Sequence, residues 1–384
     1  MKCSGIEVST GDHIEVHFDS VINVVDHPVG VPDPDVFLAP AWIDLQVNGY
    51  AGVDYNSPVT PQEEIARSIG VLHSTGTSRF FPTVITGAPA DMVESLRNLA
   101  KAKLSLPEGS SIEAFHVEGP HISPDDGPRG AHPKHWVRKP DLEEYKAWQD
   151  ATGGLIRLVT VSPEWPETPK YIEALVNDGC VVSIGHMNAN GQQIQDAVSA
   201  GATMSTHLGN GAHQVLPRHP NYIWEQLAED RLTAGFIVDG IHLGVSFFKT
   251  ALRAKGVGRS LLVTDASMPA CATPGIYKLG EQEVELTPDN RVVLRGQTRL
   301  AGSALRMDRA IENVIAQTGV SLLEAVSMAT RNPARIGRIS GRQRGLTPGE
   351  RADVVQFRYD REKNRLDVVR TFRGGEEVYR SEAA

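Results

Sequence analysis

SLLVTDAS, residues 260–267, is a short apolar run that leads into a carboxylate, Asp265, followed by small residues. Such a run is typical of a buried β-strand. One interpretation is a strand end at which Asp265 starts a turn or caps a helix. The other is that the strand carries Asp265 into a functional site, and the rest of the chain distinguishes between the two.

Seven similar runs precede this one, at residues 42–49, 78–86, 112–119, 156–163, 181–186, 203–210 and 234–240. Stretches with helical periodicity, such as PQEEIARSIGVLHSTG and GQQIQDAVSAG, lie between them. This alternation predicts parallel βαβ units. Eight such units in about 230 residues predict an α/β fold, a closed (β/α)8 barrel of the TIM type. A doubly wound open sheet is the alternative fold, but no G-x-G-x-x-G motif follows the first strand.

Both ends of the chain read as short alternating strands, for example HIEVHF near the start and ADVVQFRYD near the end. Alternation of this kind is typical of strands with one buried face. We therefore expect residues 1–39 and 345–384 to form a small β-sandwich domain from both termini. Residues 40–344 would form the barrel domain.

The composition is that of a globular enzyme. The 384 residues are 40% hydrophobic and 22% charged, without the bias of a disordered chain. The net charge of −9 argues against nucleic acid as a partner, because binding a phosphate backbone needs clustered Lys and Arg.

The location of the protein is also predicted. No apolar run approaches the roughly 18 residues of a membrane span, and the first residues, MKCSGIEVSTGDHIEVHF, lack the apolar segment of a signal peptide. Cys3, Cys180 and Cys271 are odd in number and far apart, which indicates reduced thiols. We expect a cytoplasmic protein with no membrane partner.

Polar side chains recur at or near the ends of the predicted strands. They are Asp44, Gln46, Asn48, His116, Glu118, His186, His207, Asn210, Asp239, His242 and Asp265. In a barrel the carboxyl ends of the strands converge on one mouth, where active sites form. Each charged group among them would cost several kcal/mol if it were buried unpaired. A bound divalent cation accounts for a Glu, two His and an Asp that end four different strands.

Nine stretches in this order resemble the N-acetylglucosamine-6-phosphate deacetylase family of the amidohydrolase superfamily, over nearly the whole chain. They are WIDLQVNGYAGVDYN, HVEGPHISP with GAHP, SIGHMNA, AGATMSTHLGN, VDGIHL, LLVTDA, LAGSAL, SMATRNPAR and GLTPGERADVV. The resemblance implies a barrel flanked by a β-sandwich, hydrolysis of the N-acetyl group of an amino sugar 6-phosphate, and a homodimer. The chain departs from the family in HLGNGAH (207–213), in PDDGPRG (124–130) and at Ser267 and Met268, which border the expected substrate pocket.

Taken position by position, the resemblance makes Glu118, His186 and His207 the metal ligands and Asp265 the general acid/base. His132 would polarise the scissile carbonyl. The residues expected to bind sugar and phosphate are Ala131, His132, Asn210, Gly211, Arg218, Asp239, Gly240, Ile241, His242, Leu300, Ala301 and Gly302. His116, His121 and His213 stay outside this expected site.

The chemistry of these residue types supports the implied roles. Two imidazoles and one carboxylate leave an open position on one divalent ion, expected to be Zn²⁺ with Fe²⁺, Co²⁺ or Mn²⁺ as alternatives. Such an ion polarises the amide and activates water near neutral pH. A neighbouring carboxylate can take the proton of that water and pass it to the leaving amine. This favours the functional interpretation of Asp265.

Several alternatives remain open. The substrate could instead be an unphosphorylated N-acetyl sugar, N-acetylgalactosamine 6-phosphate or an N-acyl-D-amino acid. Cyclic-amide hydrolases carry H-x-H on the first strand and a lysine on the fourth, whereas this chain has Gln46-Val47-Asn48 and no lysine in 156–163. A non-catalytic scaffold relative typically loses its ligands, and all of them are present here.

Overall fold

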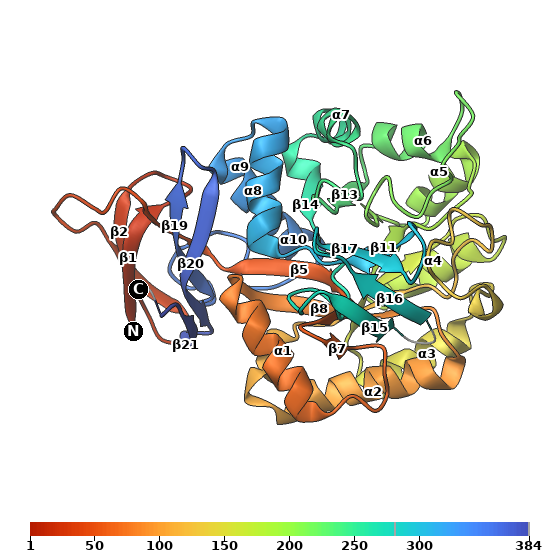
Figure 1. Cartoon of the computed structure of the whole chain (residues 1–384), viewed down its shortest axis with the longest axis horizontal. Coiled ribbons are helices and arrows are strands. Elements are labelled where there is room, and N and C mark those ends of the chain that lie inside the picture. The colour runs from red at the N-terminus through yellow and green to blue at the C-terminus, as the bar shows by residue number, and fades with distance from the viewer. Residues whose placement is uncertain (280–281, 383–384) are drawn as a thin grey trace.

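The computed structural model describes residues 1–279 and 282–382, and within them eight parallel strands form a barrel (Figure 1). The strand order is β14-β13-β12-β11-β10-β9-β8-β5. A parallel bridge between Val47 and Ala266 joins the two edges of this sheet. The prediction of a TIM-type barrel is therefore confirmed. The strands are β5 (Trp42–Val47), β8 (Thr77–Ile85), β9 (Phe115–Glu118), β10 (Ile156–Val161), β11 (Val181–Ile184), β12 (Met204–Ser205), β13 (Thr233–Phe236) and β14 (Ser260–Leu262).

Helices surround the barrel, and their apolar faces pack against strands that are buried on both sides (Figure 1). Side-chain caps define several of them: Asn190 and Gln193 form a capping box at the start of α5, and Ser321 and Glu324 form another at α9. The helices are α1 (Gln62–Ser74), α2 (Pro89–Ser105), α3 (Leu142–Thr152), α4 (Thr168–Asn177), α5 (Gly191–Ser199), α6 (Tyr222–Ala228), α7 (Val245–Lys255), α8 (Met307–Thr318), α9 (Leu322–Ala329) and α10 (Arg331–Ile336), with 3-10 turns η1 (Pro107–Ser111), η2 (Lys134–Trp136) and η3 (Val257–Arg259). No helix in the described ranges is long and apolar enough to cross a membrane.

The two ends of the chain meet in a seven-stranded sheet, as far as the described residues show, at the left of Figure 1. Its order is β21-β20-β19-β4-β1-β2-β3. Phe18 in β2 and Phe372 in β20 have ring centroids 5.0 Å apart although three strands separate them in the sheet. The sheet thus folds over around a small apolar core, in agreement with the predicted β-sandwich. Its strands are β1 (Lys2–Glu7), β2 (His13–Phe18), β3 (Ile22–Asp26), β4 (Val36–Pro40), β19 (Val354–Asp360), β20 (Arg365–Arg373) and β21 (Glu376–Arg380).

A four-stranded antiparallel sheet follows β14, and the sequence analysis did not predict it. Its strands are β15 (Gly275–Leu279), β16 (Gln282–Leu286), β17 (Arg291–Leu294) and β18 (Leu300–Ser303), drawn in teal to blue in Figure 1. We call this sheet the flap. Alternation in QEVEL and the turn TPDN between β16 and β17 are signals that could have revealed it. The flap packs against Ala131 and carries Leu300, Ala301 and Gly302 to the barrel mouth. A short hairpin of β6 (Gly49–Tyr50) and β7 (Val53–Asp54) lies after β5.

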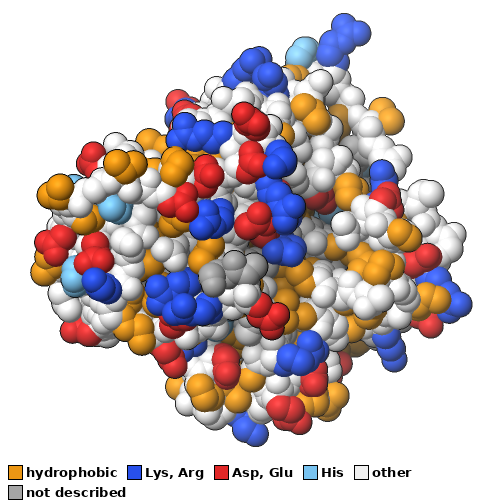
Figure 2. Space-filling model, turned by 60° about the vertical axis from the view of Figure 1, so that its left-hand side comes forward, with side chains coloured by type: hydrophobic (Ala, Val, Ile, Leu, Met, Phe, Trp, Pro, Cys, Tyr) orange, Lys and Arg blue, Asp and Glu red, His pale blue; other side chains and the backbone are white. Residues whose placement is uncertain are grey.

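Charged side chains of both signs are interspersed on the face shown in Figure 2. That face therefore lacks the extended basic surface with which proteins bind a nucleic-acid backbone.

Candidate active site

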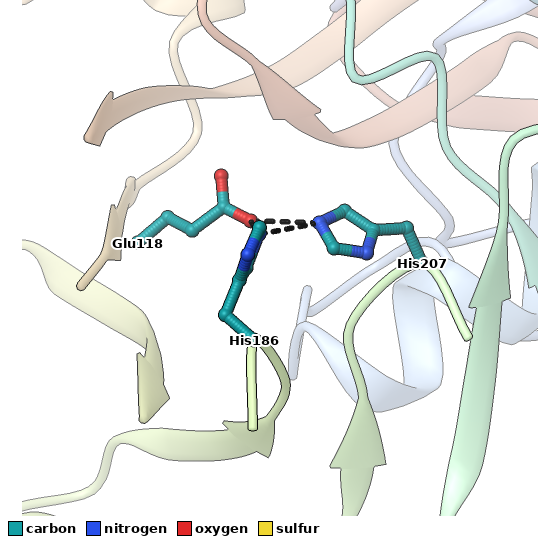
Figure 3. A group of neighbouring side chains, drawn as sticks. All are labelled: Glu118, His186 and His207. Carbon is teal, nitrogen blue, oxygen red and sulfur yellow. Dashed lines mark hydrogen bonds and ion pairs between the residues drawn. The ribbon is translucent and has the colours of Figure 1, made fainter. Parts of the chain in front are cut away.

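Three side chains from different strands meet at the carboxyl end of the barrel (Figure 3). Oε1 of Glu118 lies 3.1 Å from Nε2 of His186 and 2.9 Å from Nε2 of His207. The two Nε2 atoms are 3.0 Å apart. All three side chains are buried, with exposed fractions of 2% for Glu118, 7% for His186 and 2% for His207. Among the described residues, these form the one group of His, Cys, Asp and Glu side chains that could hold a metal ion.

The backbone at these strand ends is unusual. His186, His207 and Asp265 have φ values of 49°, 26° and 48°, in the left-handed region that non-glycine residues rarely adopt. The strands end before these residues, and β12 and β14 are shorter than the predicted runs 203–210 and 260–267. Such strain persists only where the surroundings enforce it, and it clusters at functional sites. Here it occurs at three of the candidate site residues at the barrel mouth.

The hydrogen bond at Nδ1 of His186 leaves the lone pair of its Nε2 for a metal. Nδ1 of His186 lies 2.8 Å from the carbonyl oxygen of Pro128, so Nδ1 donates a proton there and Nε2 stays unprotonated. Nδ1 of His207 is buried and has no partner among the described residues. Burial alone would raise the pKa of Glu118, but the neighbouring imidazoles of His186 and His207 hold that pKa well below its usual range.

The donor set fits a divalent metal ion. Two ligands at about 2.0–2.1 Å from a tetrahedral ion lie about 3.3 Å apart, close to the 2.9–3.1 Å separations found here. Without a cation, the two Nε2 atoms and Oε1 of Glu118 would lie within hydrogen-bond distance of one another with too few protons to pair all three. The geometry and the chemistry of Glu118, His186 and His207 therefore agree.

Asp265 lies beside this group, and two side-chain amides hold its carboxylate. One amide is on β5 and the other is on the residue that follows β5. Nε2 of Gln46 donates to Oδ1 of Asp265 at 3.0 Å, and Nδ2 of Asn48 donates to the same oxygen at 2.7 Å. Within the described residues, Oδ2 of Asp265 has no hydrogen-bond partner. Burial, followed by the negative charge of Glu118, raises the pKa of Asp265 to about 6. One oxygen is thus fixed while the other can exchange a proton.

The ring of His132 packs against that of His186, with ring centroids 4.5 Å apart. Its Nδ1 is 2.8 Å from the hydroxyl oxygen of Thr86. Burial lowers the pKa of His132 to about 3, so the ring is neutral. If the Thr86 hydroxyl donates to Nδ1, the proton of the ring is on Nε2. A Cβ at Gly119 would stand 2.3 Å from Oγ1 of Thr86, so glycine at 119 leaves room for this contact.

A cavity of about 190 Å³ contains these groups, and we call it the active cavity. Of the residues predicted to bind substrate, those that line it are Ala131, His132, Asn210, Gly211, His242, Leu300, Ala301 and Gly302. Ser267, which was expected to border the substrate pocket, also lines it, and lining residues that were not predicted include Ile85, Ile237 and Leu279. Leu279 comes from the flap, and its position could not be inferred without predicting that sheet.

Four predicted substrate-binding residues do not line the active cavity. Asp239 accepts hydrogen bonds from the backbone of Ile241 and His242, and its Oδ2 lies 2.5 Å from Nδ1 of His242. It therefore orients His242, while Gly240 and Ile241 form the turn between them. The side chain of Arg218 is exposed on the loop that follows Gly211.

Close packing against His186 explains why residue 211 is glycine. Its φ is 56°, and a Cβ there would lie 2.6 Å from Nδ1 of His186. The backbone of this loop therefore packs on the ring of a candidate ligand, so a side chain at this position would displace His186.

The remaining histidines of the sequence analysis lie outside the cavity. His116 is in the barrel interior, between the hydroxyls of Thr83 and Thr160. His121 is buried against Trp148 and Tyr171. His213 pairs with Tyr222.

Known proteins share both the sequence and the fold. No model of a protein family matches the chain. The N-acetylglucosamine-6-phosphate deacetylase of Bacillus subtilis (strain 168) is 32% identical over 324 residues, 84% of this chain and 80% of that protein. The N-acetylgalactosamine-6-phosphate deacetylase of Shewanella sp. (strain ANA-3) is 34% identical over 358 residues, 90% of this chain and 84% of that protein. A mutant of N-acetyl-D-glucosamine-6-phosphate deacetylase from Mycobacterium smegmatis, solved in complex with N-acetyl-D-glucosamine-6-phosphate, has a TM-score of 0.85 at 27% identity and covers 95% of this chain and 94% of that one.

Proposed function

The chain belongs to the N-acetylglucosamine-6-phosphate deacetylase family of the amidohydrolase superfamily, and we propose that it hydrolyses N-acetylglucosamine 6-phosphate to acetate and glucosamine 6-phosphate. The observation that carries this proposal is the convergence of Glu118, His186 and His207 within 3.1 Å, beside Asp265 in one cavity. These groups can hold a metal with an open position and place a proton acceptor beside it, as metal-dependent amide hydrolysis requires.

Glu118, His186 and His207 would hold one divalent ion, which we propose to be Zn²⁺, with Fe²⁺, Co²⁺ or Mn²⁺ as alternatives. Imidazole and carboxylate ligands suit ions of this kind. When bound, the metal supplies Lewis-acid polarisation of the amide and lowers the pKa of water at its open position.

We propose that Asp265 moves the protons. Its Oδ2 would accept a proton from the attacking water, while Gln46 and Asn48 hold Oδ1 in place. The water oxygen first bonds to the carbonyl carbon, and the C–N bond then breaks as Asp265 returns the proton to the leaving nitrogen. A raised pKa suits this double role, because the group must be able both to accept and to release a proton.

His132 would assist at the carbonyl oxygen. With the Thr86 hydroxyl bonded to Nδ1, the Nε2–H group of His132 can donate a hydrogen bond to that oxygen as its negative charge develops. Because the ring is neutral and buried, this donor keeps its proton during the reaction.

We propose that Asn210, Gly211, His242 and the flap residues Leu300, Ala301 and Gly302 contact the sugar, because they line the active cavity around the candidate metal ligands. Asp239 would support this by orienting His242. Arg218 remains our proposed phosphate ligand. A guanidinium can bind a phosphate through two parallel hydrogen bonds. Such a contact would offset the repulsion between the phosphate dianion and a chain of net charge −9. Its exposed side chain would have to fold over the cavity when the sugar phosphate enters.

The cellular setting is part of the proposal. Free thiols at Cys3, Cys180 and Cys271 support a cytoplasmic location, and membership of the family supports a homodimer.

We also propose that residues 40–344 form the catalytic domain and that residues 1–39 with 345–384 form the β-sandwich domain.

The test is release of acetate from a panel of N-acyl compounds by the purified protein. The panel contains N-acetylglucosamine 6-phosphate, N-acetylgalactosamine 6-phosphate, unphosphorylated N-acetylglucosamine and an N-acetyl-D-amino acid. We expect the highest kcat/KM for N-acetylglucosamine 6-phosphate and loss of activity after chelation. A higher kcat/KM for any other member would contradict the substrate assignment, and a chelator-resistant rate would contradict the metal assignment.

A further inference from the structure

A second cavity, of about 140 Å³, lies beside the active cavity and has no role in the chemistry described above. Ile85, Ala131 and Leu279 line both cavities, so the two share a wall. The second cavity lies between the start of α2, the end of β8 and the flap. Much of its lining is apolar, including Met92 and Trp136.

The shared wall lies next to the group that we propose to bind the scissile carbonyl. Thr86 lines the second cavity, and its hydroxyl bonds to Nδ1 of His132, which lines the active cavity. An acyl group whose carbonyl oxygen faces Nε2 of His132 lies in the active cavity, of which this wall is one side. Ile85, Ala131 and Leu279, which line both cavities, lie between that acyl group and the second cavity.

One polar atom in the second cavity lacks a partner. The Ser95 side chain, on α2, is 1% exposed, and its hydroxyl oxygen has no hydrogen bond among the described residues. A buried hydroxyl without a partner is unfavourable. Ser95 is therefore a ready partner for a polar group that enters this cavity.

The charge of the lining limits what can enter. Asp91, in the first turn of α2, lines the cavity, and no described lining residue is Lys or Arg. A chain that ends in a carboxylate would meet only negative charge there. A neutral hydroxyl can instead bond to Ser95.

From the shared wall, the unpaired Ser95 hydroxyl and the acidic lining, we propose that the second cavity receives the tail of an N-acyl group longer than acetyl, of three to five carbons with a hydroxyl near its end. This proposal rests on the proposed function and extends it to hydroxyacyl amino sugar phosphates. The space is sufficient, because one water occupies about 30 Å³ in the liquid and the cavity measures about 140 Å³. The reaction is the same hydrolysis, with a hydroxy acid released in place of acetate.

The experiment compares four amides of glucosamine 6-phosphate on the metal-loaded wild-type protein: N-acetyl, N-butanoyl, N-4-hydroxybutanoyl and N-succinyl. We expect kcat/KM for the hydroxybutanoyl amide to be within about fivefold of the acetyl amide. A site closed behind the acetyl methyl would instead lose about 10- to 200-fold for each added methylene. The butanoyl amide should fall about tenfold below its hydroxyl analogue, because it leaves Ser95 unpaired. The succinyl amide should be the poorest.

Two substitutions at Ser95 distinguish the effect of the cavity volume from the effect of the hydrogen bond to Ser95. Ser95→Leu fills the cavity and should lower kcat/KM for both four-carbon neutral amides by at least tenfold relative to N-acetyl. Ser95→Ala keeps the space and should only make the butanoyl and hydroxybutanoyl amides equal. If Ser95→Leu does not fold, Ile85→Ala widens the shared wall and should raise the ratio of butanoyl to acetyl kcat/KM.

Failure of this proposal differs from failure of the proposed function. If the wild type hydrolyses the N-acetyl amide but both four-carbon neutral amides react more than a hundredfold more slowly, the second cavity does not receive the acyl chain. The same conclusion follows if Ser95→Leu changes all substrates equally. If the N-acetyl amide itself is not hydrolysed, the proposed function is wrong.

Discussion

Asn48 donates a hydrogen bond of 2.7 Å to Oδ1 of Asp265, across 217 positions of the sequence. The contact spans the point where the first and last strands of the barrel come together, next to the Val47–Ala266 bridge. Closure of the barrel thus also orients the carboxylate that we propose as the proton carrier.

Asp265→Asn keeps the shape of the side chain but removes the group that accepts a proton. We expect turnover to fall by about two to four orders of magnitude, the scale of a positioned acid/base. Metal content should stay unchanged, because Glu118, His186 and His207 are intact. Steady-state kinetics beside elemental analysis measures both, and near-normal turnover would show that another group carries the proton.

One metal ion should bind per chain. The described residues offer one suitable cluster, and Gln46 and Asn48 present neutral amides to Asp265 rather than imidazoles to a second ion. Elemental analysis after dialysis should give one equivalent in the wild type and little in His186→Ala. His213→Ala is the matched control, because that ring pairs with Tyr222 outside the cavity and should keep both metal and activity. Two tightly bound equivalents would disprove a single site.

Thr86→Val replaces the hydroxyl that bonds to His132 with a methyl group of similar size. Without this bond His132 can change tautomer, so we expect kcat/KM to fall about 10- to 100-fold, the scale found for hydrogen-bond partners that orient metal-ligating histidines. Thr86→Ser keeps the hydroxyl and should keep most of the activity. Nitrogen NMR of His132 reports the tautomer directly. Equal loss in the Ser and Val variants would mean that packing, not the hydrogen bond, is responsible.

Arg218→Ala should affect phosphorylated substrates selectively. A charge-assisted contact typically contributes about 1.5–3 kcal/mol, so kcat/KM for N-acetylglucosamine 6-phosphate should fall by about one to two orders of magnitude. The rate on the unphosphorylated sugar should change little. Arg253→Ala, an exposed arginine on α7, removes the same charge elsewhere and serves as the control. If kcat/KM falls equally for both sugars, Arg218 does not bind the phosphate.

Asp353→Asn should destabilise the protein in a pH-dependent way. Asp353 is fully buried and pairs with Arg79 of the barrel at 2.9 Å and with Arg342 at 2.6 Å. Burial alone would raise the pKa of Asp353, but the charges of Arg342 and Arg79 hold that pKa far below its usual value. Breaking a buried pair typically costs about 3–5 kcal/mol, which urea unfolding at pH 7 should detect.

The sign of the pH effect follows from the lowered pKa. The unfolded value is about 3.9, so the stabilisation from ionised Asp353 is complete above that pH and is lost as the pH falls toward the folded value. Wild type and variant should therefore converge below about pH 4. Asp367→Asn, which removes half-exposed Asp367 from its pair with Arg365, should cost less than about 1 kcal/mol at pH 7. A constant difference between wild type and Asp353→Asn across pH would contradict this assignment.

The sequence alone determined the barrel and the kind of chemistry at its mouth. Alternating apolar runs and helical stretches carry a local period, and eight of them admit few closed arrangements. Polar residues such as Glu118, His207 and Asp265 ended those runs. Since parallel strands in a barrel end at the same mouth, their meeting could be inferred without coordinates. The β-rich ends of the chain likewise showed their strands by alternation.

Only the tertiary structure decided how the site is closed and what surrounds it. The flap brings Leu279 and Leu300 to the active cavity, while the loop after Gly211 leaves Arg218 exposed. The hydroxyl of Thr86 reaches His132 because residue 119 is glycine. The second cavity with Ser95 exists because α2, β8 and the flap meet there. The physical reason is that loops and cavities have no sequence period, and their positions depend on long-range packing that no local pattern encodes.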